Sequence, residues 1–503
     1  MDILSAYKPL RNKIAKLGSE DSLQTIWGYS QFLQMERFSF PVDIEVSKFF
    51  LDAKFPQALV SEWELEILAK EVILNSGPLV DKSTSLKRWD IFIETIRGIK
   101  SLENHIYKSF GSQENVLIEM IRIAHRQFQW QTDFPNAATT IRYYLIFNRS
   151  DIDQICATKL NLSVRDIYLC GMACMGSFIS HAAMGYPITS TVPTITQETV
   201  NNFLLFASRS ISELRKLLKA EQRFDANFAY AYNSLRTFPL ILASNALLCP
   251  IPTLLFWRMT RGLYYELVSE PKFANAFGVS FQQYVGDAID RACRDKKVRR
   301  LAEVTYGPKG SNKRSVDWIV YDQSAALFLE CKARRLSWNA KSELIDLEPL
   351  NKDIDILASS VIQIYKTAVD YLEGKYPHLP FQHERKIYPT VVTLENWHVF
   401  GPVMIKRLDE AVAKKLLEEN LPSDLIAEMP YSIWSIEDLE EGCQLLEHGS
   451  IASFMDGKLN DQEMKQWEWL PYIKKMFPKA PRRRLFDKEY REMFSEIRGA
   501  RDG

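Results

Sequence analysis

Apolar residues recur at three- and four-residue spacing along most of the first 265 residues, as in 114–126 and 200–218. This spacing is the pattern of amphipathic helices. Polar or proline-containing breaks separate the segments at 18–21, 75–78, 133–136 and 191–194. Three polar residues stand where helices would be capped: Asp151, Ser163 and Thr196. The sequence therefore predicts a large all-α N-terminal domain over residues 1–265.

Two uncharged stretches, 168–188 and 238–257, are long enough to be considered as membrane spans. The first contains three glycines and Pro187, and the second contains three prolines. A span needs about 20 mainly apolar residues with every backbone group satisfied, and this many helix breakers argue against one. The first residues also lack the basic-then-apolar order of a signal peptide. We expect both stretches to be buried core helices and the protein to be cytoplasmic.

Beyond residue 265 the pattern changes to alternating helical and strand-like segments. A helix is expected from Phe281, and a longer one over 353–373. Short apolar or β-branched runs predict strands at 316–321, 325–333, 387–394 and 431–435. Helices and strands in this order indicate an α/β domain, which we place at 266–450. Residues 451–503 form a helical, basic C-terminal region, so the predicted fold class is α+β with several domains.

The first two strand-like runs place acidic and basic side chains beside apolar ones. Side chains alternate along a strand, so Glu330 and Lys332 share one face of the second run. If the turn is centred between Gln323 and Ser324, Asp317 lies directly opposite Glu330. Opposed residues have Cβ atoms about 4.5–5.5 Å apart, which allows two carboxylates to share one divalent ion.

This combination of side chains predicts a phosphodiesterase site. Adjacent carboxylates repel each other and retain a proton unless a cation lies between them. Hard oxygen ligands suit Mg²⁺ or Mn²⁺, which keep several waters for a phosphate. Lys332 is placed to orient or deprotonate such a water and to offset developing negative charge. A structural ion-pair triad is the alternative reading of the same residues.

The spacing of Asp317, Glu330 and Lys332 on a strand pair after a helix resembles the PD-(D/E)xK phosphodiesterase superfamily. That superfamily includes restriction endonucleases, resolvases and many bacterial phage-defence nucleases. The similarity covers roughly residues 275–440. It implies a restriction-endonuclease-like α/β domain with a central mixed sheet, in which Asp317 and Glu330 hold Mg²⁺ or Mn²⁺ and Lys332 acts on the water. It also implies DNA as substrate rather than RNA, and an antiviral defence or restriction system.

The chain departs from this superfamily at three places. One is the later helix, where some members carry Gln-xxx-Tyr and this chain has Gln363-Ile-Tyr365, which does not support the recombination-exonuclease branch. Val316 stands where the motif has proline, a position that varies widely among members. Many members also carry a glutamate on the preceding helix, where this chain has Gln282 and Gln283. One of these glutamines, or Asp287, would take the accessory place of that glutamate.

Charge and composition refine this interpretation. The chain has 63 basic and 63 acidic residues, so its net charge is zero. An ordinary composition, 46% hydrophobic and 25% charged, excludes collagen-like, disordered and disulfide-stapled chains. Cys170 and Cys174 lie in an apolar run and are expected to be buried free thiols. The basic residues are concentrated in segments such as 294–314 and 474–484. Candidate phosphate-binding residues beside the hairpin are Lys309, Lys313, Arg314, Arg334 and Arg335.

Three functions fit these observations. The first is a metal-dependent endonuclease acting on DNA in an antiviral or restriction system. The second is a catalytically weak or inactive nucleic-acid-binding subunit, which the glutamines in place of the helix glutamate keep open. The third is a repair or recombination nuclease acting on branched or damaged DNA. In each, the N-terminal helices would bind a partner, form a homodimer or hetero-complex, or gate the nuclease.

Overall fold

The computed structural model describes most of the chain. The described residues are 3–35, 38–78, 82–110, 116–131, 134–190, 194–294, 297–310, 312–336, 341, 348–382, 384–399, 401–446, 449–480 and 482–499. Residues 114–115, 133 and 191–193, which belong to segments considered above, lie outside them. The protein is a mixed α+β protein with its helices mainly in the N-terminal part, as predicted.

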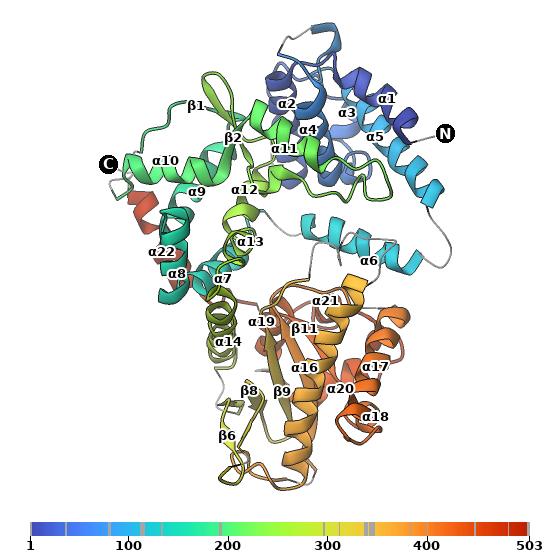
Figure 1. Ribbon diagram of the computed structural model, residues 1–503, viewed down its shortest axis with the longest axis vertical. Coiled ribbons are helices and arrows are strands. Elements are labelled where there is room, and N and C mark those ends of the chain that lie inside the picture. Colours follow the sequence, from blue (N-terminus) through green and yellow to red (C-terminus); the bar gives the residue numbers. More distant parts are fainter. Residues whose placement is uncertain are drawn as a thin grey trace. The chain divides into compact units, whose positions relative to one another are not determined.

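The chain divides into two compact units (Figure 1). Unit 1 comprises Met1–Phe273, Ser342–Leu344 and Lys488–Gly503, and unit 2 comprises Ala274–Lys341 and Ile345–Asp487. The boundary thus falls after Phe273 rather than at 265. The predicted separate region 451–503 is not a unit of its own, because residues up to Asp487 pack within unit 2. Trp469, for example, lies against Trp434 with ring centroids 5.1 Å apart.

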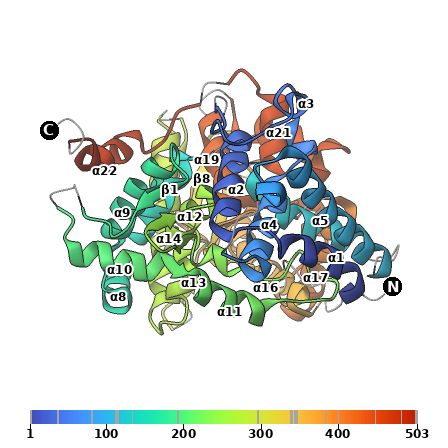
Figure 2. The ribbon, with the colours of Figure 1, turned by 90° about the horizontal axis from the view of Figure 1, so that it is seen from above.

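Unit 1 is built mainly from helices. They are α1 (Ile3–Ile14), α2 (Ser19–Gln34), α3 (Lys48–Leu51), α4 (Glu62–Asn75), α5 (Trp89–Phe110), α6 (Val116–Gln127), α7 (Ala137–Phe147), α8 (Ser150–Leu160), α9 (Val164–Phe178), α10 (Gln197–Ala207), α11 (Ile211–Glu221), α12 (Pro252–Met259), α13 (Leu263–Leu267) and α22 (Asp487–Gly499). The blue helices α1, α2, α4 and α5 pack side by side (Figures 1 and 2). Ser163 and Thr196 cap α9 and α10 as predicted, each accepting a backbone N–H. Asp151 lies in the first turn of α8, not at its cap.

Unit 1 also contains a small sheet, so the expectation of an all-α domain was wrong. Its strands are β1 (Ala183–Gly185), β2 (Ser208–Ser210), β3 (Leu240–Leu242) and β4 (Ala246–Leu248), in the order β1-β4-β3-β2. The stretch 238–257 is therefore not one core helix. It forms β3 and β4, and α12 begins only at Pro252, whose fixed φ suits the first turn of a helix. In the part of the chain that the structure describes, no helix has both the length and the apolar character needed to cross a membrane.

Unit 2 contains a five-stranded mixed sheet in the order β11-β10-β9-β8-β5, as expected for its central sheet. Its elements are α14 (Phe273–Ala292), β5 (Arg299–Ala302), β6 (Thr305–Tyr306), β7 (Lys313–Arg314), β8 (Trp318–Tyr321), β9 (Ala325–Lys332), α16 (Glu348–Leu372), β10 (Lys386–Thr393), α17 (Gly401–Glu418), α18 (Leu425–Glu428), β11 (Ser432–Ser435), α19 (Ile436–Leu445), α20 (Ile451–Leu459) and α21 (Trp469–Met476). β5, β8 and β9 pair antiparallel, whereas β9, β10 and β11 pair parallel. The four predicted strands are present within two residues of their expected bounds.

Helices cover both faces of this sheet. On one face, Phe328 of β9 packs against Tyr371 of α16, with ring centroids 6.0 Å apart. On the other face, the Trp318 indole of β8 lies against α14 and donates a hydrogen bond of 2.9 Å to the Gln282 main-chain oxygen. Because both faces are covered, every residue of β9 from Ala325 to Glu330 is buried. A carboxylate in this strand is therefore held in an apolar environment.

Candidate active site

The pairing of β8 with β9 has the predicted register. Trp318 lies opposite Leu329 and Tyr321 lies opposite Ala326, as required by a turn centred between residues 323 and 324. Continuing the pairing by one residue places Asp317 opposite Glu330. The prediction of the hairpin register, which assumed this position of the turn, is confirmed.

The structure brings Asp317, Glu330 and Lys332 together. Asp317 Oδ2 accepts a hydrogen bond from the Cys331 N–H at 2.7 Å. Lys332 Nζ donates to Glu330 Oε1 at 2.9 Å and, at the same distance, to Oε1 of Gln363 on α16. Glu330 is only 6% exposed. The two carboxylates and the ammonium therefore form a connected cluster at one edge of the sheet.

Both carboxylates hold protons more tightly than usual. Burial raises the pKa of Glu330 to about 7, and the Asp317 charge adds to this while Lys332 opposes it. Burial also raises the pKa of Asp317, opposed by the hydrogen bond from Cys331 and by Lys332. Near neutral pH the pair therefore resists carrying two negative charges. A bound cation would relieve this repulsion.

Glu303 is a third carboxylate at this site that the sequence analysis missed. Its N–H donates to the Asp317 main-chain oxygen at 2.8 Å, so it follows β5 directly beside Asp317. Its charge contributes to the raised pKa of both Asp317 and Glu330. Arg314 Nη1 lies 3.5 Å from its carboxylate. The alternation of Leu301 with Glu303 could have indicated a strand that carries this carboxylate. The basic segment around these residues was, however, not expected to form a strand.

The donor set suits a hard divalent cation, although it is small. Within the described segments, no group of three or more His, Cys, Asp or Glu side chains is arranged to hold a metal ion. Asp317 and Glu330 supply carboxylate oxygens, and Mg²⁺ is commonly held by one or two carboxylates with waters completing its shell. Burial, and to a smaller extent the neighbouring carboxylate charges, raises the pKa of both groups, and a bound cation would favour their charged forms. These two residues therefore fit Mg²⁺ or Mn²⁺.

The accessory residues predicted on the preceding helix are not brought to this cluster by any contact that the structure describes. Helix α14 meets the sheet through Trp318, which alternates with Asp317 and so faces the opposite way. Gln283 is exposed, and the charge of Asp287 acts on Arg300. The amide that reaches the cluster comes from α16 instead, as Gln363.

Four of the five predicted phosphate-binding residues are accessible. Lys309 is exposed in the loop between β6 and β7, where Gly307 and Gly310 adopt positive φ angles. Arg314 is 80% exposed, and Lys313 and Arg334 are more than half exposed. Lys313 pairs with Asp370 at 2.8 Å and Arg334 with Asp353 at 3.1 Å. These side chains present positive charge in unit 2. A phosphate would compete with the carboxylates that already pair with Lys313, Arg314 and Arg334.

Arg335 does not fit the predicted role. Its side chain is 4% exposed and pairs with Glu395 at 2.8 Å. Lys341 also contacts Glu395, and both cations hold the pKa of that carboxyl far below its usual range despite its burial. The side chain is thus part of a buried ion pair that anchors the segment after β9. Its place in the sequence, next to the exposed Arg334, gave no indication of this.

The chain was also compared with known proteins. No family model, no curated protein and no solved structure matches it.

Proposed function

We propose that this protein is a metal-dependent nuclease that hydrolyses phosphodiester bonds of nucleic acid, most simply DNA, in a cytoplasmic antiviral or restriction system. The observation that carries the proposal is the buried Glu330 carboxylate beside the half-buried Asp317, with Lys332 bonded to Glu330. Burying two carboxylates is unfavourable unless they have a partner of opposite charge. A site that binds a divalent ion supplies such a partner, whereas a purely structural triad would leave the second carboxylate weakly compensated.

Each residue has a distinct role in this proposal. Asp317 and Glu330 would hold Mg²⁺ or Mn²⁺, and the bound ion would supply a polarised water and positive charge at the phosphate. The Cys331 N–H fixes one Asp317 oxygen, which leaves the other for the ion. Gln363 holds the Lys332 amine at the edge of the pair, where it can orient the water and stabilise charge on the phosphate. Arg314 and Arg334 would contact the nucleic-acid backbone.

A cleavage assay tests the proposal. Plasmid and linear DNA, and RNA of matched length, are incubated with the protein and Mg²⁺ or Mn²⁺. We expect cleavage of DNA that chelation abolishes, and loss of at least 100-fold in rate for Asp317→Ala, Glu330→Ala and Lys332→Ala. Glu410→Ala, an exposed position on α17, is the matched control and should cut normally. Wild-type rates in Lys332→Ala would refute the assignment.

The alternative is a nucleic-acid-binding subunit with little or no activity. It is favoured by the small donor set, because the described residues provide two carboxylates from the predicted motif and no larger metal-binding group. Retained DNA binding without cleavage under either metal would support this alternative. Preferential cutting of junctions or single strands would instead indicate a repair or recombination nuclease.

Unit 1 would provide the contact with a partner or a second copy of the chain. Its segment around α3 exposes large apolar side chains, with Val42, Phe49 and Phe55 each more than 60% exposed. Exposed apolar groups that cluster in one segment are typical of interaction sites. Light scattering of the wild type and of Phe49→Ser tests this. If the wild type is a homodimer, the variant should dissociate more readily. If both proteins are monomers, the segment binds a different protein or makes no such contact.

A further inference from the structure

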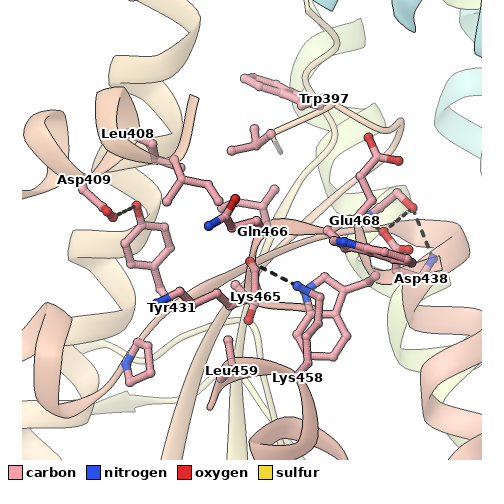
Figure 3. A pocket seen from close by; sticks show the side chains of 18 of the residues that line it. Trp397, Leu408, Asp409, Tyr431, Asp438, Lys458, Leu459, Lys465, Gln466 and Glu468 are labelled. Carbon is pink, nitrogen blue, oxygen red and sulfur yellow. Dashed lines mark hydrogen bonds between the residues drawn. The ribbon is translucent and has the colours of Figure 1, made fainter. Parts of the chain in front are cut away.

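A cavity of about 290 Å³ lies in unit 2 at the carboxyl ends of the parallel strands β10 and β11 (Figure 3). Thr393, the last residue of β10, pairs with Lys332 on one side and with Ser435 of β11 on the other. The cavity and the candidate active site therefore lie at the same edge of the sheet. With strands about 4.8 Å apart, the backbones of Lys332 and Ser435 are roughly 10 Å apart.

The walls of the cavity are largely aromatic and apolar. Trp397 follows β10, Tyr431 precedes β11, and Trp467 and Trp469 come from the segment before and at the start of α21. Leu408 and other apolar side chains complete the lining (Figure 3). Flat rings around a narrow space favour a planar ligand that can stack on them.

Asp438 supplies an unused acceptor in this lining. It is only 3% exposed, and its Oδ2 accepts hydrogen bonds of 2.7 Å from the N–H and the hydroxyl of Ser435. Its Oδ1 is also buried but has no hydrogen-bond partner among the described residues. Burial raises the pKa of Asp438 to about 7. A buried carboxyl oxygen without a partner is unfavourable, so a ligand donor at this place would stabilise it.

Lys458 supplies a donor close to the same space. It is 3% exposed, its Nζ donates a long hydrogen bond of 3.4 Å to the Lys465 main-chain oxygen, and it lies 4.9 Å from the centre of the Trp469 ring. Burial lowers its pKa to about 8, although Asp438 and Glu468 favour its charged form. Among the described residues this amine has one hydrogen-bond acceptor, so it can also donate to an acceptor on a ligand.

The combination of acceptor, donor and rings matches the edge of a nucleobase. Every base presents a hydrogen-bond acceptor next to an N–H donor, and proteins that bind unstacked bases read this edge while stacking the ring on aromatic side chains. A cationic ligand fits less well, because Lys458 already lies over Trp469 and Lys475 lies 4.3 Å from the Trp467 ring centre. A lysine thus already lies on one surface of each of these two rings.

We propose that this cavity binds a nucleobase, with Lys458 donating to its acceptor, Asp438 accepting from its N–H, and the tryptophan rings enclosing it. The base comes either from an unpaired nucleotide of a nucleic-acid chain or from a free nucleotide. The first source rests on the proposed nuclease function, because it would place the base of a bound strand at the same edge of the sheet as the cutting site. The second would make the cavity an effector site.

The test measures binding separately from cleavage. Calorimetric titrations use the full-length protein in metal-free buffer with guanosine, adenosine, cytidine and uridine. A short single-stranded oligonucleotide and a chain of the same length made only of abasic nucleotides are titrated in parallel. Lys458→Met keeps the length of the side chain and removes its donors, and Asp438→Asn is the second variant. Lys474→Met, an exposed lysine on α21, is the matched control.

We expect at least one nucleoside to bind saturably and to lose at least tenfold in affinity in Lys458→Met but not in Lys474→Met. Tighter binding of the oligonucleotide than of the abasic chain, abolished by Lys458→Met, identifies the base of a strand as the ligand. Binding of nucleosides alone identifies a free nucleotide. Choline is titrated as a cationic probe. The proposal is overturned if no nucleoside binds and Lys458→Met leaves oligonucleotide affinity unchanged, or if choline binds and the nucleosides do not. Nucleoside binding without any cleavage would refute the proposed nuclease and leave the cavity assignment standing.

Discussion

Replacing Glu330 by glutamine should stabilise the metal-free protein at alkaline pH while it abolishes cleavage. The Glu330 carboxyl is buried in β9 between covered faces of the sheet, and it is close enough to Asp317 for the two charges to repel. Glutamine has nearly the same shape and can still accept the hydrogen bond from Lys332, but it never ionises. The substitution therefore removes the cost of a buried charge without opening a cavity.

The pKa of Glu330 gives the size of the effect. Folding raises it from an ordinary 4.5 to about 7, so the folded protein holds this proton more tightly than the unfolded chain. The resulting stability is complete below pH 4.5 and is lost as the pH rises through 7. Since one pKa unit corresponds to about 1.4 kcal/mol, the loss amounts to about 3 kcal/mol. The variant does not suffer this loss, so its advantage should appear between pH 5 and pH 8.

The difference in stability between wild type and Glu330→Gln is measured at pH 5 and at pH 8 by urea unfolding. Unfolding is followed by tryptophan fluorescence in the presence of a chelator. We expect the variant's midpoint to rise relative to wild type at pH 8 and to differ little at pH 5. Adding Mg²⁺ should raise the wild-type midpoint at pH 8 and leave the variant unchanged, because only the native carboxylate pair binds the ion. Glu410→Gln, an exposed control, should show neither effect. If Glu330→Gln were less stable than wild type by the same amount at pH 5 and at pH 8, the reasoning would be refuted.

Three further outcomes follow from the structure. Glu303→Gln removes a charge that raises the pKa of Asp317 and Glu330, so the acidic limb of the pH profile of the proposed cleavage should move to lower pH. Arg335→Ala leaves a buried carboxylate with one cation and should lower the free energy of unfolding by about 3 kcal/mol in urea titrations. Lys414→Ala, which removes an exposed pair with Glu418, should cost less than about 1 kcal/mol. Gly286→Ala forces a Cβ into the Trp318 indole and should lower the free energy of unfolding by about 1–3 kcal/mol. Gly278→Ala places its Cβ in open space, so the melting temperature of that variant should not fall.

The helical segments and the candidate hairpin were readable from local patterns. The short connection between the runs 316–321 and 325–332 sets which side chains oppose one another, because the length of a hairpin turn fixes the register of its two strands. Ser163 and Thr196 could also be recognised as caps from local sequence, because a capping side chain bonds to a backbone group only two or three residues away. Where a pattern was interrupted, the local signal failed: the run 200–218 is split by β2, and 238–257 contains β3 and β4.

The sequence by itself determined the hairpin, its register and the positions of Asp317, Glu330 and Lys332, since each depends on neighbours within a few residues along two paired strands. Only the tertiary structure decided which other groups join them. Glu303 arrives through the pairing of β5 with β8, Gln363 through the packing of α16, and Arg335 is withdrawn into an ion pair with Glu395, 60 residues away. The cavity that contains Asp438 and Lys458 is likewise assembled from distant segments at the ends of β10 and β11. Contacts of this kind depend on the three-dimensional path of the chain, and no local pattern encodes them.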